Sequence, residues 1–190
     1  MSILRSFQDS AKEFKNIRSI VITALFIAIA IVLNTVLRID VTQYKTRVTF
    51  GFLCIGTIGM LFGPAMAMIA GFVTDFLAAS IFPMGPYFPG HALTAILEGM
   101  IWGVFLYQRE YKIWRIILAR TLISVFCYMF LNTLWQTILN DGAAFFALLP
   151  IRVIKNLIML PIEILLFFLL GTKLRSMYKP QISNGRGSSE

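Results

Sequence analysis

The sequence predicts an all-α integral membrane protein with six transmembrane helices and both termini in the cytoplasm. Of its 190 residues, 58% are hydrophobic and 14% are charged, whereas an ordinary soluble domain has roughly 25% charged residues. The apolar residues gather in six runs, and a bilayer core about 30 Å thick requires roughly 20 apolar residues per helix. These runs lack the alternating polar and apolar pattern of a membrane barrel, so helices are expected rather than strands.

Three segments follow one another along the chain. Residues 1–18 form a basic amphipathic cytoplasmic segment, residues 19–175 the membrane domain, and residues 176–190 a polar cytoplasmic tail that is expected to be disordered. The first segment has apolar residues at helical spacing, with basic residues between them, which favours a helix lying on the cytoplasmic membrane face. A frayed extension is the alternative. The residues concerned are Ile3, Phe7, Ala11 and Phe14, and Arg5, Lys12, Lys15 and Arg18.

The membrane domain contains the six apolar runs, and each is predicted to form one helix. The second run is short and rich in glycine, and the fifth is long enough to tilt or bend in the bilayer. The runs comprise residues 19–37, 49–61, 64–81, 91–107, 113–140 and 150–171.

The basic residues of the short loops predict the orientation. Both ends of the chain are basic, and the loop of residues 108–112 adds Arg109 and Lys112, with Arg115 just beyond. With six crossings these positions fall on one side, which is the cytoplasm by the positive-inside rule. The net charge of +8 is therefore explained by membrane topology rather than by nucleic-acid binding.

A second group of basic residues lies at the outer ends of the predicted helices, against this preference. An anionic ligand would account for it, and so would pairing with buried acids. The group consists of Arg38, Lys45, Arg47, Arg152 and Lys155, opposed only by Asp40 and Asp141.

The sequence lacks the motifs of known catalytic and metal sites. The single histidine, His91, excludes multi-histidine metal sites. Cys54 and Cys127 lie inside apolar runs without the CxxC spacing, as small core residues do. The stretch "GFLCIGT" lacks the lysine of a phosphate-binding loop. We expect no cofactor, no metal and no enzymatic activity, and any ATP-driven work must come from a partner.

Several ionisable residues lie within the predicted helices. Asp75 and Glu98 would lie at a similar depth on adjacent antiparallel helices. Such a pair could serve an intramembrane hydrolase, but charges within a membrane more often pair or line a ligand cavity. Lys155 could neutralise one of them, whereas Arg120 and Glu163 lie deeper and are interpreted as a contact between helices.

Three stretches of the sequence resemble the substrate-binding S components of energy-coupling factor (ECF) vitamin transporters. The stretch "VTFGFLCIGTIGMLFGPAMAMIAGFVTDFLAA" is similar to the second and third helices of that family, which are joined by a glycine–proline turn. The stretch "FPMGPYFPGHALTAILEGMIWG" resembles the loop and fourth helix of the folate-type members, and "RVIKNLIMLPIE" their sixth helix. Together with the first helix, these stretches extend the resemblance over nearly the whole chain.

The resemblance implies a six-helix protein of the plasma membrane that captures a vitamin, folate above all, from outside. Such subunits associate with a membrane-embedded transducer and two cytoplasmic ATPases, which agrees with the missing nucleotide motif. Another vitamin or precursor, of the hydroxymethylpyrimidine or pyridoxine type, is the first alternative. A solitary membrane transporter and a membrane enzyme are the others. The sequence shows no obvious inverted repeat, as a solitary transporter would have, and it lacks the catalytic motifs of a membrane enzyme.

Folate chemistry assigns roles to candidate site residues. Aromatic rings can stack on the flat pterin and benzoyl groups, arginine and lysine can hold the two carboxylates of the glutamate, and polar side chains can bind the pterin edge. Tyr87, Phe88 and Trp135 are the stacking candidates; Arg38, Arg47, Arg152 and Lys155 the carboxylate candidates; Glu98, Asn132 and Asn156 the edge candidates; His91 completes the set.

The stretch "IFPMGPYFPGH", residues 81–91, is interpreted as a preorganised aromatic lid. Its prolines Pro83, Pro86 and Pro89 restrict the backbone, which lowers the entropy lost when the loop closes on a ligand. The alternative is a compact turn with aromatic residues at the membrane interface. For Trp135 the alternative is packing against lipid or in the core.

Small residues spaced four apart predict a surface for a partner helix. In the resembling family, the alanine motif of the first helix faces the transducer, and here it consists of Ala24 and Ala28, with Ala30 close by. Gly63, Ala67 and Gly71 repeat the spacing in the third helix. Packing within the chain is the alternative for all of these, and it is the interpretation we give to the Gly59–Gly63 and Gly99–Gly103 pairs.

Reporter fusions test the predicted topology. Fusions at both termini and at Arg109 should report a cytoplasmic location, and fusions at Met84 and Gly142 an external one, because six crossings place them so. A reporter that locates the C-terminus outside would contradict the six-helix topology.

Overall fold

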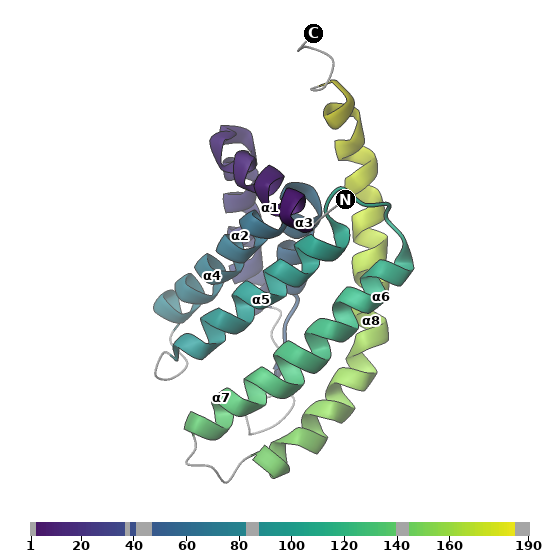
Figure 1. Cartoon of the computed structure of the whole chain (residues 1–190). Coiled ribbons are helices and arrows are strands. Elements are labelled where there is room, and N and C mark those ends of the chain that lie inside the picture. Colours follow the sequence, from purple (N-terminus) through teal and green to yellow (C-terminus); the bar gives the residue numbers. More distant parts are fainter. Residues whose placement is uncertain (1–2, 37–38, 41–46, 83–87, 140–144, 185–190) are drawn as a thin grey trace.

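The computed structural model describes residues 3–36, 39–40, 47–82, 88–139 and 145–184, of which helices make up nearly all (Figure 1). Among these, the side chains of residues 3, 39–40, 47–48, 139, 145–149, 151–152 and 175–184 are not described. The helices are α1 (Ile3–Lys12), the 3₁₀ turn η1 (Glu13–Lys15), α2 (Ile17–Val36), α3 (Phe52–Phe62), α4 (Pro64–Ile81), α5 (Pro89–Leu106), α6 (Ile113–Leu122), η2 (Ile123–Leu131), α7 (Asn132–Leu139) and α8 (Phe145–Asn184).

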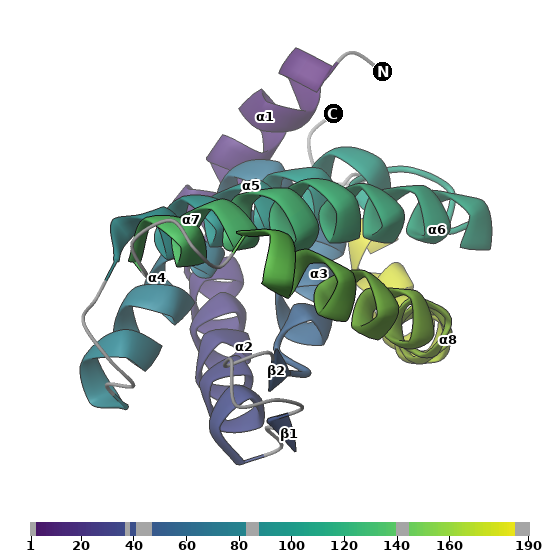
Figure 2. The same cartoon turned by 90° about the horizontal axis from the view of Figure 1, so that it is seen from below.

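A two-residue antiparallel pair accompanies the helices. Strand β1 (Ile39–Asp40) pairs with β2 (Arg47–Val48), so that Ile39 lies opposite Val48. Both lie near the end of α2 (Figure 2).

Within the described part of the chain, five helices are long and apolar enough to cross a membrane. They are α2, α4, α5, the continuous helix formed by α6, η2 and α7, and α8. The second predicted run, residues 49–61, forms the shorter apolar helix α3, which has 11 residues. The predicted all-α membrane class is thus confirmed. The fifth run contains a π-helical stretch, η2, at its centre.

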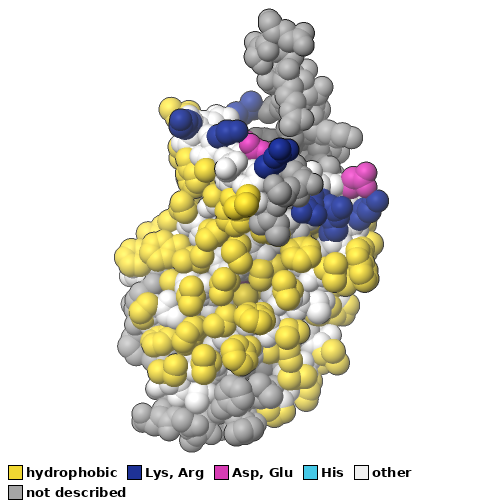
Figure 3. All heavy atoms as spheres, viewed as in Figure 1, with side chains coloured by type: hydrophobic (Ala, Val, Ile, Leu, Met, Phe, Trp, Pro, Cys, Tyr) yellow, Lys and Arg dark blue, Asp and Glu magenta, His cyan; other side chains and the backbone are white. Residues whose placement is uncertain are grey.

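Apolar side chains cover the face shown in Figure 3 in a broad band. Lysine and arginine gather beyond one edge of this band, at the end that carries α1 and the α5–α6 connection. Lipid tails would cover the exposed apolar residues, while basic residues prefer the headgroup region. Members of the exposed apolar set include Val21, Leu25, Val32, Phe126 and Leu157.

Helices α4 and α5 approach each other closely because glycines lie at their contacts. A Cβ atom added at Gly71 would lie 2.4 Å from the carbonyl oxygen of Ala95, and one at Gly99 would lie 2.3 Å from that of Ala67. Any side chain would push the two backbones apart at these points. The packing predicted for Gly99 within the chain is confirmed, and α4 and α5 form one tightly joined pair.

Burial within the chain corrects part of the predicted transducer surface. Ala30, Gly63, Ala67 and Gly71 are buried against other parts of this chain, so they cannot present an exposed face to a partner helix. Internal packing, the alternative, describes these four residues. Ala24 and Ala28 are exposed on α2, as a partner surface requires.

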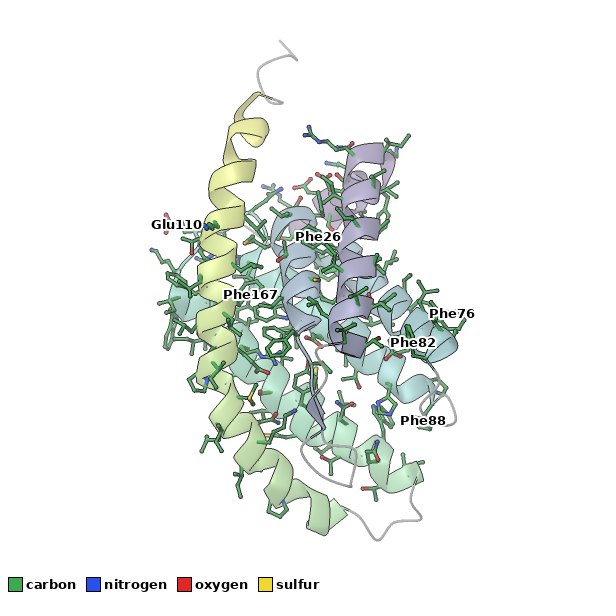
Figure 4. All side chains as sticks on the ribbon, turned by 180° about the vertical axis from the view of Figure 1, so that it is seen from behind. Phe26, Phe76, Phe82, Phe88, Glu110 and Phe167 are labelled. Carbon is green, nitrogen blue, oxygen red and sulfur yellow. The ribbon has the colours of Figure 1, made fainter. Side chains whose placement is uncertain are left out.

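The core between α3, α5 and α8 is built on stacked rings. The rings of Trp102 and Phe167 lie 4.4 Å apart between centroids, at an interplanar angle of 22°, and Phe167 points from α8 into the bundle (Figure 4). Gly56 of α3 makes room for them, since a Cβ there would lie 2.5 Å from the Phe167 ring. Aromatic packing of this kind adds about 1 kcal/mol to the burial of the rings.

Helix α1 is attached to the turn between α3 and α4 by one buried hydroxyl. Gly63 in this turn has a φ of +89° and no side chain to cap α4. Ser10 of α1, 0% exposed, replaces the missing cap: its Oγ accepts from the backbone N–H groups of Ala65 (3.0 Å) and Met66 (3.3 Å). The same hydroxyl donates to the carbonyl oxygen of Phe62 at 2.7 Å. These donors would otherwise be unsatisfied at the start of the helix.

The contacts of α1 differ from those expected of a helix lying on the membrane by its apolar face. Ser6 and Ser10 are its buried residues, Ala11 is exposed, and Phe14 packs against the core from η1. Ser6 and Ser10 lie one helical turn apart, and the Ser10 hydroxyl satisfies the α3–α4 turn, so this polar face of α1 is turned inward.

Helix α8 continues to Asn184, beyond the membrane domain that was expected to end at residue 175. Residues 176–184, expected to be disordered, are thus helical in the structure. A helix that already exists gains one hydrogen bond for each residue it adds, without a new nucleation step. Residues 185–190 of the expected tail lie outside the described residues.

The replacement Ser10→Ala tests the capping contact. Loss of the hydroxyl leaves two buried N–H groups and a carbonyl without their partner, and should lower the free energy of unfolding by about 1–3 kcal/mol. Thermal unfolding in detergent measures the loss, and hydrogen exchange should accelerate at the amides of Ala65 and Met66. Ser80→Ala is the matched control, because the exposed Ser80 hydroxyl only donates back to Phe76 of its own helix. Equal melting of the two variants would contradict the role of Ser10.

Candidate functional site

An aromatic cluster lies where α5 begins. The Phe88 ring lies 5.5 Å from the Trp135 ring and 6.2 Å from the His91 ring, between centroids, and Figure 4 shows Phe88 at this end of the bundle. Gly90 permits the approach, since a Cβ there would lie 2.3 Å from the Phe88 ring and 2.6 Å from the Trp135 ring. The structure thus brings together three of the predicted site residues from α7 and the start of α5.

Thr94 of α5 holds Trp135 in this cluster. The Nε1–H of Trp135 donates to Thr94 Oγ1 at 3.1 Å, and the Thr94 hydroxyl donates to the carbonyl oxygen of Gly90 at 3.1 Å. The analysis of sequence patterns missed Thr94. A threonine in an apolar helix ordinarily bonds to its own backbone, so nothing in the sequence distinguished it from the other threonines of the membrane domain.

A buried charge network lies one helical turn deeper. Arg120 of α6 binds Glu163 of α8 through Nε at 2.8 Å and Nη2 at 2.6 Å, and its Nη1 lies 3.7 Å from Glu98 Oε1. Tyr128 donates to Glu98 Oε2 at 2.8 Å, and the guanidinium carbon lies 4.4 Å from the centre of the Phe52 ring. The predicted contact between the helices of Arg120 and Glu163 is confirmed. Arg120 also lies beside Glu98, a contact that the sequence analysis did not predict.

The two sets of contacts form successive rungs between α5 and the antiparallel η2–α7 segment. The outer rung, nearer the start of α5, is the contact of Trp135 with Thr94. The inner rung, one turn further along α5, is the contact of Tyr128 with Glu98. Asn132 lies between them in the chain, and its Oδ1 is buried without a hydrogen-bond partner among the described residues. The arrangement passes from aromatic rings, through an amide, to a carboxylate.

Helix α8 contributes to this part of the bundle from another side. Asn156 is buried, 8% exposed, and lies two turns before Glu163, hence on the same face of the helix. Lys155 is half-buried. Asp75 of α4 has one buried carboxylate oxygen, Oδ2, for which the described residues provide no hydrogen-bond partner.

The remaining predicted site residues are not placed by the structure. Arg38 and Tyr87 lie outside the described residues, as do the other residues of the 83–87 segment of the proposed lid. Arg47 and Arg152 are described by their backbones alone, in β2 and α8. Their contact with a ligand stays a prediction.

Comparison with known proteins agrees with this architecture. The family model of the ECF transporter substrate-specific component matches residues 18–171. A folate transporter, FolT, of Clostridium novyi (strain NT) is 36% identical over 154 residues, which cover 81% of this chain and 88% of that protein. A folate transporter, FolT, of Leuconostoc mesenteroides subsp. mesenteroides is 29% identical over 165 residues, which cover 84% and 88%.

A solved structure is similar as well. The crystal structure of FolT bound with folic acid superposes with a TM-score of 0.74 at 33% sequence identity, and the match covers 80% of this chain and 90% of that one. The apolar helices, the matched family model and these relatives agree with one another. The chain is a multi-pass protein of the plasma membrane and belongs to the family of ECF transporter substrate-specific components.

Proposed function

We propose that this protein is the folate-capturing subunit of an ATP-driven ECF importer. It binds folate at the outer side of the membrane and delivers it by associating with a transducer and two ATPases, and it has no catalytic activity of its own. The observation that carries the proposal is the outer aromatic cluster of Phe88, His91 and Trp135, followed at greater depth by the Glu98 carboxylate. The folate transporters among its relatives support the choice of vitamin.

The inner end of the site suits the pterin edge. A pterin presents N–H donors, and an ionised carboxylate accepts hydrogen bonds only. Glu98 is held in place by Tyr128 through Oε2, while its buried Oε1 lies 3.7 Å from Arg120 Nη1 and has no hydrogen-bond partner among the described residues. Asn132, one rung outward, provides a further buried oxygen. A flat ring bound here reaches the aromatic side chains of the outer rung, where stacking contributes about 1 kcal/mol per ring.

The outer end suits the glutamate part of folate, which carries two carboxylates. Lys155 lies eight residues before Glu163 on α8, about 12 Å along the helix axis. It belongs to the group of basic residues at the outer helix ends that does not follow the positive-inside rule. Arg152 lies nearly one further turn outward. Arg38 and Arg47 of the segment after α2 are proposed to complete the basic set. Folate therefore binds with its pterin inward and its glutamate outward.

The six-helix topology with cytoplasmic termini belongs to the same proposal. An 11-residue helix extends about 16 Å, so α3 crosses only together with the chain segment that precedes it. With α3 counted, six crossings return the C-terminus to the side of α1. The basic residues near α1 and the α5–α6 connection support a cytoplasmic location for that end.

The exposed alanines of α2 are proposed as the contact with the transducer. Ala24 and Ala28 lie one turn apart and are both exposed, so another helix can approach the α2 backbone there. Large apolar side chains such as Val21 and Leu25 flank them.

Removal of the outer positive charges tests the mode of folate binding. Arg152→Ala or Lys155→Ala should weaken folate binding at least tenfold, about 1.4 kcal/mol, because each leaves a carboxylate without its partner. Arg47→Ala should cost less, since water and salt screen a charge nearer to the solvent. Titration calorimetry on the purified protein measures all three affinities.

Pterin without the glutamate provides the control. It should bind the wild type and the charge variants equally well, because it lacks the carboxylates. If Lys155 only neutralised a buried acid, Lys155→Ala would lower the melting temperature without ligand and weaken folate and pterin alike, and the carboxylate contact would be refuted.

Bulky replacements on α2 test the partner surface. Ala24→Trp combined with Ala28→Trp should abolish assembly with the transducer and folate uptake while folate binding by the isolated protein survives, because close helix contact needs small residues. Ile29→Trp, an exposed position on another face of α2, is the control and should leave assembly intact. Loss of binding with assembly preserved would show that the alanines serve the chain itself. Co-purification and uptake assays separate these outcomes.

A further inference from the structure

The hydroxyl of Thr94 is fully engaged within the protein. It is buried, with Thr94 only 4% exposed, donates to the Gly90 carbonyl at 3.1 Å and accepts the indole N–H of Trp135 at 3.1 Å. A hydroxyl has one hydrogen. Because that hydrogen is directed to its own helix, the oxygen is held as a fixed acceptor for the indole.

Two further contacts restrict the same indole ring. The Phe88 ring lies 5.5 Å away at an interplanar angle of 51°, and the backbone of Gly90 approaches so closely that a Cβ would lie 2.6 Å from Trp135 Cδ2. All these contacts come from α5 or the residue before it. Trp135 stands on α7, so its orientation is set by a different helix from its own.

We propose that Thr94 is a positioning residue that fixes the Trp135 indole as a stacking surface for the ligand. The inference rests on the proposed function and adds a statement about specificity. Since the indole N–H is already bonded to Thr94, Trp135 meets a ligand with its ring face and donates no hydrogen bond to it. The outer rung thus selects a flat aromatic ring, and the polar edge is recognised at Asn132 and Glu98.

The indole N–H signal of Trp135 provides a test that needs no ligand. The chain has three tryptophans, and Trp135→Phe assigns the signal in an NMR spectrum of ¹⁵N-labelled protein in detergent. Thr94→Val keeps the side-chain shape but removes the acceptor, so the signal should shift and its hydrogen exchange should accelerate at least about fivefold. Thr94→Ser keeps the hydroxyl and should preserve both. Thr137→Val is the matched control on α7, because the Thr137 hydroxyl donates only to Thr133 of the same segment.

Folate affinity provides the second readout. Thr94→Val should weaken folate binding about fivefold, the loss expected for one hydrogen bond, and Thr94→Ser should stay within about twofold of the wild type. In a Trp135→Phe background there is no indole N–H to hold, so Thr94→Val should change the affinity little. This coupling separates positioning from a general packing defect, which would weaken binding in both backgrounds.

Three results would overturn the inference. They are an unchanged indole signal in Thr94→Val, a Thr94→Ser variant as impaired as Thr94→Val, and an equal loss of affinity with and without the indole. A wild type that binds no folate would overturn the proposed function alone, because the indole signal without ligand still decides whether Thr94 positions Trp135.

Discussion

The buried guanidinium of Arg120 is the interaction on which the arrangement of the bundle depends. A charged group with 2% of its side chain exposed is tolerated in a membrane protein only when it is paired. Its partners come from two other helices, Glu163 of α8 and Glu98 of α5, and Phe52 of α3 lies over the guanidinium. Removing one partner of such a group costs about 3–5 kcal/mol, so α5, α6 and α8 are held in one relative position.

That constraint reaches the candidate site through Glu98. With its carboxylate held by Arg120 and Tyr128, α5 is aligned with η2 and α7, and the same alignment sets Thr94 opposite Trp135. On its other side α5 is joined to α4 by glycine contacts without room for a methyl group. The aromatic cluster therefore stands on a part of the bundle with little freedom to shift, as a preorganised binding surface requires.

The opposite end of the α4–α5 pair, where α4 begins, is held by hydrogen bonds with α1. The positive φ of Gly63 makes the α3–α4 turn possible, and Ser10 of α1 satisfies the free N–H groups that this turn leaves at the start of α4. The amino-terminal segment is therefore part of the packed domain. Ala24 and Ala28 of α2 are exposed, as the proposed contact with the transducer requires.

The sequence by itself determined the all-α membrane class, the approximate positions of the apolar helices and the family, because local apolar runs and short motifs determine all three. It also indicated Phe88, His91, Trp135 and Glu98 as candidate site residues. It did not reveal the roles of Thr94, Ser10 or Ala30. A hydroxyl or methyl group in an apolar helix has the same local pattern whether it faces lipid, its own backbone or another helix. Which of these it meets is decided by helix rotation and contact, and these depend on residues far apart in the chain, such as Arg120 and Glu163.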